Sequence, residues 1–436
     1  MSPQIEGTIA KLLALTQRDQ QRCWFNALNP SSDFLPLDDR GYVIWSGGGE
    51  TLSLQQTITQ PAGNYDYGGL TARLKLVWWA DRARLFVDGE FKQEGDLFDS
   101  SCRLLLAEGW QPGQTVEVRL DLTSPNHDRG GLMKAQLIWE NEAQPQACPH
   151  WLGEQLTILH RYLQRFCPEK LEALGSLLQP LAALDCSDRG QLEAEIIKIN
   201  EGLEHVAPEI KQRTFHLLGH GHLDLAWLWP VKETWGVGEA TFRSVINLQR
   251  GFPELTFGHT SPVLYQWIKH HRPPLWKTIK QAVEQGQWEL LAGMWVEPDT
   301  NLVAGESLAR QLLYGQRFYL EEFGQLSLVG WLPDSFGFSA QLPQLLTQAG
   351  IDYFVSGKLQ WGDGKPFPHG VCWWESPDGS RVLMVQSPPN VAGVMDTDAI
   401  AMANYWLDWE GQTGLKEMIW LPGVGDHGGG PPGIWC

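Results

Sequence analysis

The sequence predicts an α/β protein with an N-terminal β-sandwich-like domain, a helical connector, and then a unit in which strands and helices alternate. Three observations predict this order: short runs rich in valine, leucine and aromatic residues at the start, apolar residues at helical spacing in the middle, and an alternation of both patterns at the end. We place the domains at residues 1–145, 146–213 and 214–436. The 436 residues, of which 43% are hydrophobic, suffice for two or three ordinary domain cores.

The first domain is predicted from strand-like runs between about residues 40 and 140. LKLVWWA, ARLFVDGEF and TVEVRLDLT are separated by turns rich in glycine, aspartate and proline, and Asp88-Gly89 is a hairpin signal. Strands at such short, regular spacing favour a β-sandwich. This domain either binds a ligand or braces its neighbour, and we favour bracing.

The connector is predicted from apolar residues at i, i+3, i+4 and i+7. This spacing recurs in EQLTILHRYLQRF, KLEALGSLLQPLAALD and GQLEAEIIKINEGLEHV and indicates helices. We expect Pro180 and the pair Ser187-Asp188 to interrupt the helical stretches.

From Thr214 onward, strand-like runs such as WELLAG and LSLVGWL alternate with helical stretches, which is the rhythm of a parallel sheet or barrel. In such folds the carboxyl ends of the strands form the ligand-binding face. We therefore expect a functional site where ionisable residues follow the predicted strands. These residues are His222, Asp224, His259, Glu297, Asp299, Asp334, Lys358, Asp426 and His427.

The stretch FHLLGHGHLDLAWLWP carries a metal-binding pattern. His220, His222 and Asp224 lie two residues apart, so on a strand their side chains point to the same side. Imidazole and carboxylate ligands suit zinc. The alternative is that these groups are only hydrogen-bonded near the end of a strand.

A second candidate is Asp334, in GWLPDSFGFSAQLPQLL. One interpretation is that Asp334 or Ser335 caps the following helix. However, Phe336 and Phe338 flank the turn, and a carboxylate held among aromatic rings also suits attack on an oxocarbenium-like carbon.

Two further loops contribute candidates. In GMWVEPDTNLVAGESLARQ, Asp299 is a candidate site residue, whereas Glu306 and Arg310 at i, i+4 predict a structural ion pair. In the glycine-rich LPGVGDHGGGPP, Asp426 and His427 are the groups able to move a proton. The alternative there is a plain glycine-rich turn.

Composition disfavours several classes of partner. The net charge of −18 argues against nucleic acid, and seven scattered cysteines without a CxxC pair predict free thiols. Because we find no apolar run of transmembrane length and no signal-peptide pattern, we predict a cytoplasmic protein without a membrane partner. The sequence leaves a homo-oligomer open.

Five segments, in order and in spacing, resemble the family 38 α-mannosidases, in the branch that includes the cytosolic and vacuolar enzymes. The segments are GHGHLDLAWLWP, GMWVEPDTNLVAGESLARQLLYGQRFY, GWLPDSFGFSAQLPQLLTQAGIDYFVSGKLQW, FPHGVCWWESPDGSRVL and GVGDHGGGP. The resemblance runs from about Thr214 to Pro431. It implies a retaining hydrolase of terminal α-D-mannosides that acts on α-mannoside oligosaccharides, holds one zinc ion (Zn2+), and contains a seven-stranded βα barrel.

Residue by residue, the resemblance implies His222 and Asp224 as zinc ligands and Asp334 as both a ligand and the catalytic nucleophile. It implies Asp426 as the acid/base, with the neighbouring His427 as a rival. The predicted substrate-binding residues are Trp227, which would be the platform under the sugar, together with Asp299, Phe336 and His427.

The resemblance ends at Gly430-Pro431, whereas family members continue and carry their remaining zinc ligand, a histidine, in that continuation. We therefore expect an incomplete seven-stranded βα barrel, truncated at its C-terminal end, with the fourth protein ligand missing and little or no activity in this chain alone. Two alternatives stay open. One is another HxD metallohydrolase of the sugar deacetylase type, which would give Asp334 no role, and the other is a non-catalytic remnant.

Overall fold

The structure, a computed structural model, describes residues 2–28, 34–61, 65–97, 100–126, 128–206, 208–360, 367–388, 394–425 and 429. The chain folds into two compact units, Met1–Gln212 and Arg213–Cys436.

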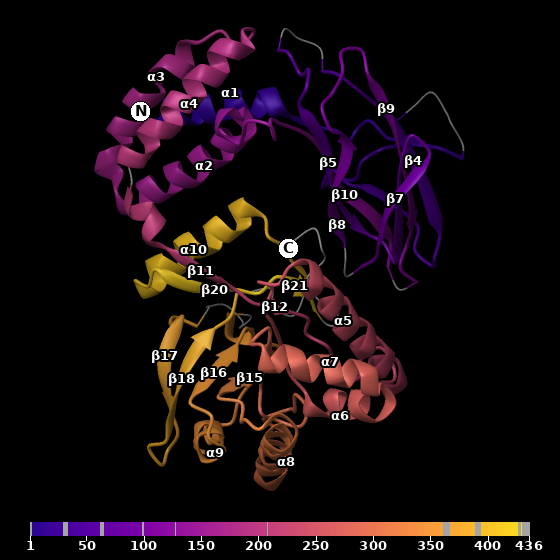
Figure 1. Ribbon diagram of the computed structural model, residues 1–436, viewed down its shortest axis with the longest axis vertical. Helices are drawn as coiled ribbons and strands as arrows, with labels where there is room; N and C mark the ends of the chain where they lie inside the picture. Colours follow the sequence, from indigo (N-terminus) through magenta and orange to yellow (C-terminus); the bar gives the residue numbers. More distant parts are fainter. Residues whose placement is uncertain are drawn as a thin grey trace. The chain divides into compact units, whose positions relative to one another are not determined.

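The first unit contains two five-stranded sheets whose neighbouring strands are antiparallel (Figure 1). One has the order β1-β10-β5-β8 with β3 also paired to β10, and the other has the order β2-β4-β9-β6-β7. The strands are β1 (Gln17–Asp19), β2 (Phe25–Asn26), β3 (Val43–Trp45), β4 (Thr51–Thr59), β5 (Thr71–Trp79), β6 (Arg82–Val87), β7 (Glu90–Gly95), β8 (Ser101–Ala107), β9 (Thr115–Thr123) and β10 (Gly130–Glu140).

Strand β9 shows why these residues form sheets with one buried face. Val116, Val118, Leu120 and Leu122 are almost completely buried, whereas the residues between them are more exposed. This alternation is the period of a strand with one face toward the core. Residues 88 and 89 form the predicted hairpin turn between β6 and β7, with φ of 50° and 78°.

The helices of the first unit are α1 (Ser2–Thr16), α2 (Pro149–Phe166), α3 (Leu171–Ala183) and α4 (Arg189–Val206), with short 3-10 helices η1 (Pro145–Ala147), η2 (Pro168–Lys170) and η3 (Pro208–Gln212). The sequence analysis did not predict α1. Its buried residues Ile5, Ile9 and Leu12 follow helical spacing, and Lys11 donates hydrogen bonds to the carbonyl oxygens of Leu181 and Leu184 at 3.2 and 2.6 Å. Helix α1 therefore packs with the helices of the predicted connector.

Two expected helix boundaries have different outcomes. Asp188 accepts a hydrogen bond from the backbone N–H of Gln191, so it caps α4 as a boundary residue should. Pro180 does not separate helices, because it lies inside α3. Leu178 and Leu181 on either side of it are fully buried, and this packing outweighs the hydrogen bond that proline cannot make.

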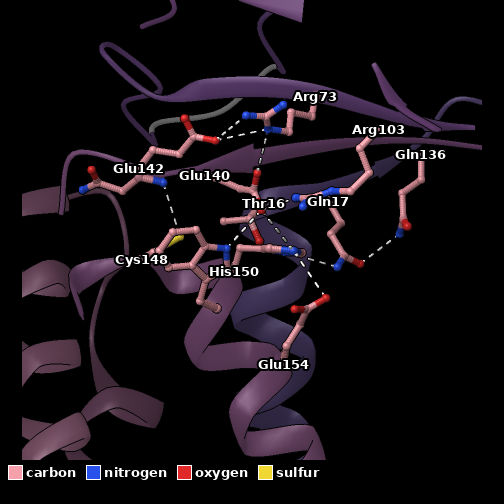
Figure 2. Close-up of polar contacts among 12 residues, drawn as sticks. Thr16, Gln17, Arg73, Arg103, Gln136, Glu140, Glu142, Cys148, His150 and Glu154 are labelled. Carbon is pink, nitrogen blue, oxygen red and sulfur yellow. Dashed lines mark hydrogen bonds and ion pairs between the residues drawn. The ribbon is translucent and has the colours of Figure 1, made fainter. Parts of the chain in front are cut away.

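A buried carboxylate links the end of β10 to helix α2 (Figure 2). Glu140, whose side chain is 2% exposed, accepts hydrogen bonds from Arg103 at 2.5 Å and from the indole N–H of Trp151 at 3.0 Å. Arg73 lies 3.4 Å from the same carboxylate and also binds Glu142 at 2.7 Å. The Trp151 hydrogen bond to this carboxylate attaches helix α2 to β10, while the two arginines link the same carboxylate to β8 and β5.

The second unit is a mixed α/β structure (Figure 1). Its strands are β11 (Thr214–Leu217), β12 (Gly219–His220), β13 (Phe257–His259), β14 (Trp288–Leu290), β15 (Val329–Trp331), β16 (Tyr353–Ser356), β17 (Val371–Glu375), β18 (Arg381–Gln386), β19 (Val394–Met395), β20 (Glu417–Trp420) and β21 (Gly423–Val424). Its helices are α5 (Val231–Gly251), α6 (Pro262–His271), α7 (Pro273–Glu284), α8 (Gly305–Phe323), α9 (Leu342–Gln348) and α10 (Ala399–Thr413), with the 3-10 helix η4 (Lys358–Gln360).

The strands pair in parallel within three groups: β20-β11, β12-β13-β14 and β15-β16-β18. A hydrogen bond from the backbone N–H of Ala292, just after β14, to the carbonyl oxygen of Val329 in β15 links the second group to the third. One apolar cluster, including Trp331, Val355 and Trp420, gathers side chains from β15, β16 and β20. The strand pairs of the described residues do not include β18 with β20, so a closed seven-stranded barrel stays a prediction.

Helices cover these strands with apolar side chains. Phe242 of α5, Tyr265 of α6 and Tyr319 of α8 share one core cluster with Trp288 of β14. A second cluster joins Leu346 of α9 to the strands β16 and β18. Gly423 shows one reason for the glycines near the end of the chain, because a Cβ there would lie 1.5 Å from the carbonyl oxygen of residue 220.

Candidate metal centre

Two of the candidate ligands lie directly after strand β12. His222 is buried, with 2% of its side chain exposed, and Asp224 is 26% exposed. Asp334 arrives from a different part of the chain, just after β15, as expected for residues at the carboxyl ends of parallel strands. Potential ligand atoms of His222, Asp224 and Asp334 all lie within 4.8 Å of one another. The fold thus brings together three groups that the sequence analysis singled out.

The chemistry of this cluster fits a divalent cation. Among the described residues, neither ring nitrogen of His222 has a hydrogen-bond partner, although a buried imidazole without one is costly. The Nε2 atom lies 3.3 Å from Asp224 Oδ1, and the Nδ1 atom lies 3.5 Å from Glu297 Oε1. Three carboxylates therefore surround one imidazole, with Lys358 as a positive partner of Asp334. A bound dication would balance this excess of negative charge.

The same surroundings perturb protonation of the cluster. Burial opposes a charge on His222, but the Glu297 charge and the contact with Asp224 outweigh burial, so the pKa of His222 lies well above its usual value. A proton and a metal ion therefore compete for the same imidazole, because a metal-ligating histidine must be neutral.

His220 makes structural contacts instead of joining the cluster. Its Nδ1 atom lies 2.9 Å from the carbonyl oxygen of Gly258, and its Nε2 atom accepts a hydrogen bond from the indole N–H of Trp331 at 3.3 Å. Burial, and then the neighbouring His259, lower the pKa of His220 to about 3. His259 is also buried, and its Nδ1 atom lies 2.9 Å from the carbonyl oxygen of Thr260.

Lys358 contacts Asp334, and an exposed aromatic ring follows each candidate aspartate in the chain: Phe336 after Asp334 and Trp227 after Asp224. The Lys358 ammonium forms an ion pair with Asp334 Oδ1 and lies 5.2 Å from the centre of the Phe336 ring. Phe336 is 86% exposed and Trp227 is 62% exposed, so both present large apolar faces to solvent. Such faces suit the apolar side of a sugar ring.

Asp299 has the contacts of a turn-capping residue. Its Oδ1 atom accepts the backbone N–H groups of Asn301 and Leu302, both at 2.8 Å, and these bonds lower the pKa of Asp299 below its usual value. The next residue, Thr300, donates its hydroxyl to the carbonyl of Gly337, which links this loop to the one after Asp334. The substrate-binding role of Asp299 stays a prediction.

Other sequence predictions near this face have mixed outcomes. Glu306 and Arg310 form the expected ion pair at 2.8 Å. Asp426 and His427 lie outside the described residues. Sequence reasoning singled out Glu297 by its position after β14 but gave it no role, and it did not single out Thr260, which donates to Glu297 at 2.7 Å.

Parallel strands that deliver a histidine and two aspartates to one point define an α/β protein with a candidate metal centre. The family model described as "Glycosyl hydrolases family 38 N-terminal domain" matches residues 212–434, just over half of the chain. The chain therefore belongs to glycosyl hydrolase family 38.

Two curated relatives illustrate the match. The chain is 39% identical over 220 residues to Alpha-mannosidase 2C1 of Homo sapiens, a region that covers 50% of this chain and 21% of the relative. It is also 39% identical to Alpha-mannosidase of Saccharomyces cerevisiae, over 49% of this chain and 20% of that protein. The matched region thus spans about a fifth of the length of these relatives.

Among solved structures, an alpha-mannosidase from Enterococcus faecalis V583 is similar, with a TM-score of 0.44 and 22% identity over 50% of this chain and 25% of that chain. Separately, the helices in the described part of the chain include none with the length and apolar character needed to cross a membrane.

Proposed function

We propose that this protein hydrolyses terminal α-D-mannosides with retention of configuration, with Asp334 as the nucleophile and a zinc ion held by His222, Asp224 and Asp334. The observation that carries the proposal is the convergence of these three side chains in a family 38 chain whose curated relatives include proteins named alpha-mannosidase. Family membership also argues against the sugar deacetylase alternative, in which Asp334 had no role.

The residues present would hold the metal through one imidazole nitrogen and two carboxylates, a donor set that suits zinc. When bound, zinc would act as a Lewis acid toward sugar oxygens and add positive charge beside the reacting carbon. Asp334 is only partly exposed, and its carboxylate forms an ion pair with the Lys358 ammonium.

The chain's own residues then supply the remaining chemistry. The Asp334 carboxylate forms a bond to the anomeric carbon while the glycosidic bond breaks, and the leaving oxygen takes a proton from the acid/base, for which Asp426 stays our candidate. In the second half, the acid/base removes a proton from water, the water oxygen attacks the anomeric carbon, and the bond to Asp334 breaks. Trp227 and Phe336 would contact the apolar face of the sugar through their exposed rings.

The test is release of nitrophenol from 4-nitrophenyl α-D-mannoside by zinc-loaded protein, compared with the β-mannoside and the α-glucoside. We expect the α-mannoside to be hydrolysed in preference to the other two substrates, at a low rate in this chain alone, and a loss of about a thousandfold or more in Asp334→Asn, because the amide cannot attack carbon. The matched control is Asp352→Asn, which changes an exposed aspartate beside β16.

Folded, zinc-loaded wild-type protein that hydrolyses the β-mannoside or the α-glucoside faster than the α-mannoside would refute the proposed activity. An Asp334→Asn variant that keeps more than about a tenth of the wild-type rate would refute the assignment of the nucleophile.

A further inference from the structure

Glu297 is a largely buried carboxylate that the proposed reaction does not use. It follows β14, with its side chain 13% exposed. Among the ion pairs of the described residues, its partner is His222, not a lysine or arginine. Burying a carboxylate is unfavourable unless a positive charge lies nearby, and the candidate metal centre is where such a charge would be.

Both contacts of Glu297 point to the candidate metal centre. Its Oε1 atom lies 3.5 Å from His222 Nδ1, on the side of the imidazole opposite Nε2. The same oxygen accepts a hydrogen bond at 2.7 Å from the hydroxyl of Thr260, a residue that is 2% exposed. A chain of polar contacts therefore runs from Thr260 through Glu297 to the His222 ring. It ends at Asp224 Oδ1, 3.3 Å from His222 Nε2.

This chain of contacts favours one tautomer of the His222 ring. A carboxylate facing Nδ1 stabilises the imidazole with its hydrogen on Nδ1, which leaves the lone pair of Nε2 on the side that faces Asp224. A carboxylate in this position also makes the imidazole a stronger ligand. Thr260 restricts the carboxylate, because its hydroxyl occupies the oxygen that faces the ring.

We infer that Glu297 is a positioning residue that orients His222 and sets its tautomer for a divalent cation bound between Nε2, Asp224 and Asp334. The inference rests on the proposed function for the identity of the site, and it adds a residue that acts through a ligand without touching the ion. Thr260 is the support of Glu297 in this arrangement.

The experiment measures zinc affinity directly, by competition with a fluorescent chelator, in the wild type and in three variants. Glu297→Ala is expected to raise the zinc Kd by about 10–100-fold, the usual effect of losing such a partner. Glu297→Gln keeps an acceptor oxygen of the same shape and should recover part of the affinity. Thr260→Val, which removes the supporting hydroxyl, should have a smaller effect in the same direction.

The matched control is Glu306→Gln. Glu306 is exposed and pairs with Arg310, so this variant removes a carboxylate from the same stretch of chain without touching His222. Its zinc Kd should stay within about twofold of the wild type, since exposed charges are screened by salt. A fold check by circular dichroism accompanies each variant, and the isosteric Glu297→Gln variant decides the question if Glu297→Ala does not fold.

The outcomes separate this inference from the proposed function. Wild-type protein that fails to bind zinc at one ion per chain would refute the metal centre itself. Wild-type protein that binds zinc, with folded Glu297 variants that bind it as tightly, would refute the role of Glu297 and leave the metal centre standing. Weaker binding in both Glu297 variants, but not in Glu306→Gln, would support the inference.

Discussion

Removing the carboxylate of Glu140 should measurably destabilise the first unit (Figure 2). The carboxylate is 2% exposed and accepts charged or polar hydrogen bonds from Arg103 and Trp151, with Arg73 nearby. Losing one member of a fully buried ion pair costs about 3–5 kcal/mol. Here the side chains of Arg103 and Arg73 are 44% and 25% exposed, so water can solvate them afterwards. We therefore expect the lower end, about 3 kcal/mol, for Glu140→Ala.

The isosteric variant Glu140→Gln should cost less, about 1–2 kcal/mol, because its carbonyl oxygen can still accept the indole N–H of Trp151. The comparison is Glu94→Gln, which breaks the exposed pair of Glu94 with Arg82 at 3.3 Å and should cost less than about 1 kcal/mol.

Urea unfolding gives the free energies, and hydrogen exchange of peptides from β10 and α2 assigns the loss to this junction. If Glu140→Ala cost no more than Glu94→Gln, the view that Glu140 holds the helix to the sheet would be wrong.

Two further predictions concern histidines. His222→Ala and Asp224→Ala should each lower the zinc content of dialysed protein. His220→Ala should lower it less, because both ring nitrogens of His220 contact protein groups. Equal losses of zinc in the two histidine variants would mean that the wrong histidine was assigned as a ligand. Burial, which outweighs the attraction of Glu140, lowers the pKa of His150 to about 4, while Arg103 and Lys75 act in the same direction as burial. Because the unfolded chain takes up this proton more readily, His150 contributes stability above about pH 6.5 that is lost as the pH falls toward 4. The difference in urea midpoint between pH 7 and 5 should therefore shrink in His150→Gln, and an unchanged difference would contradict this account.

Local patterns in the sequence predicted much of the fold. The alternation in β9, the turn at Asp88-Gly89 and the helical spacing in α2 and α4 depend on neighbours along the chain, so they could be recognised without tertiary structure. Helix α1 was missed although its apolar stripe is present in the sequence. Pro180 was misjudged because the packing of its neighbours overrides a local preference.

The sequence by itself determined which residue types are available at the ends of the second unit's strands, and it singled out His222, Asp224 and Asp334 among them. The two-residue spacing alone could not separate His220 from His222, and within the sequence only the family resemblance favoured His222. Only tertiary structure decided that His220 contacts Gly258 and Trp331, while His222 faces the nearby Asp224 and, from another segment, Glu297. The physical reason is that a metal centre depends on distances between residues far apart in the chain, and the parallel strands that set those distances pair only when the chain folds.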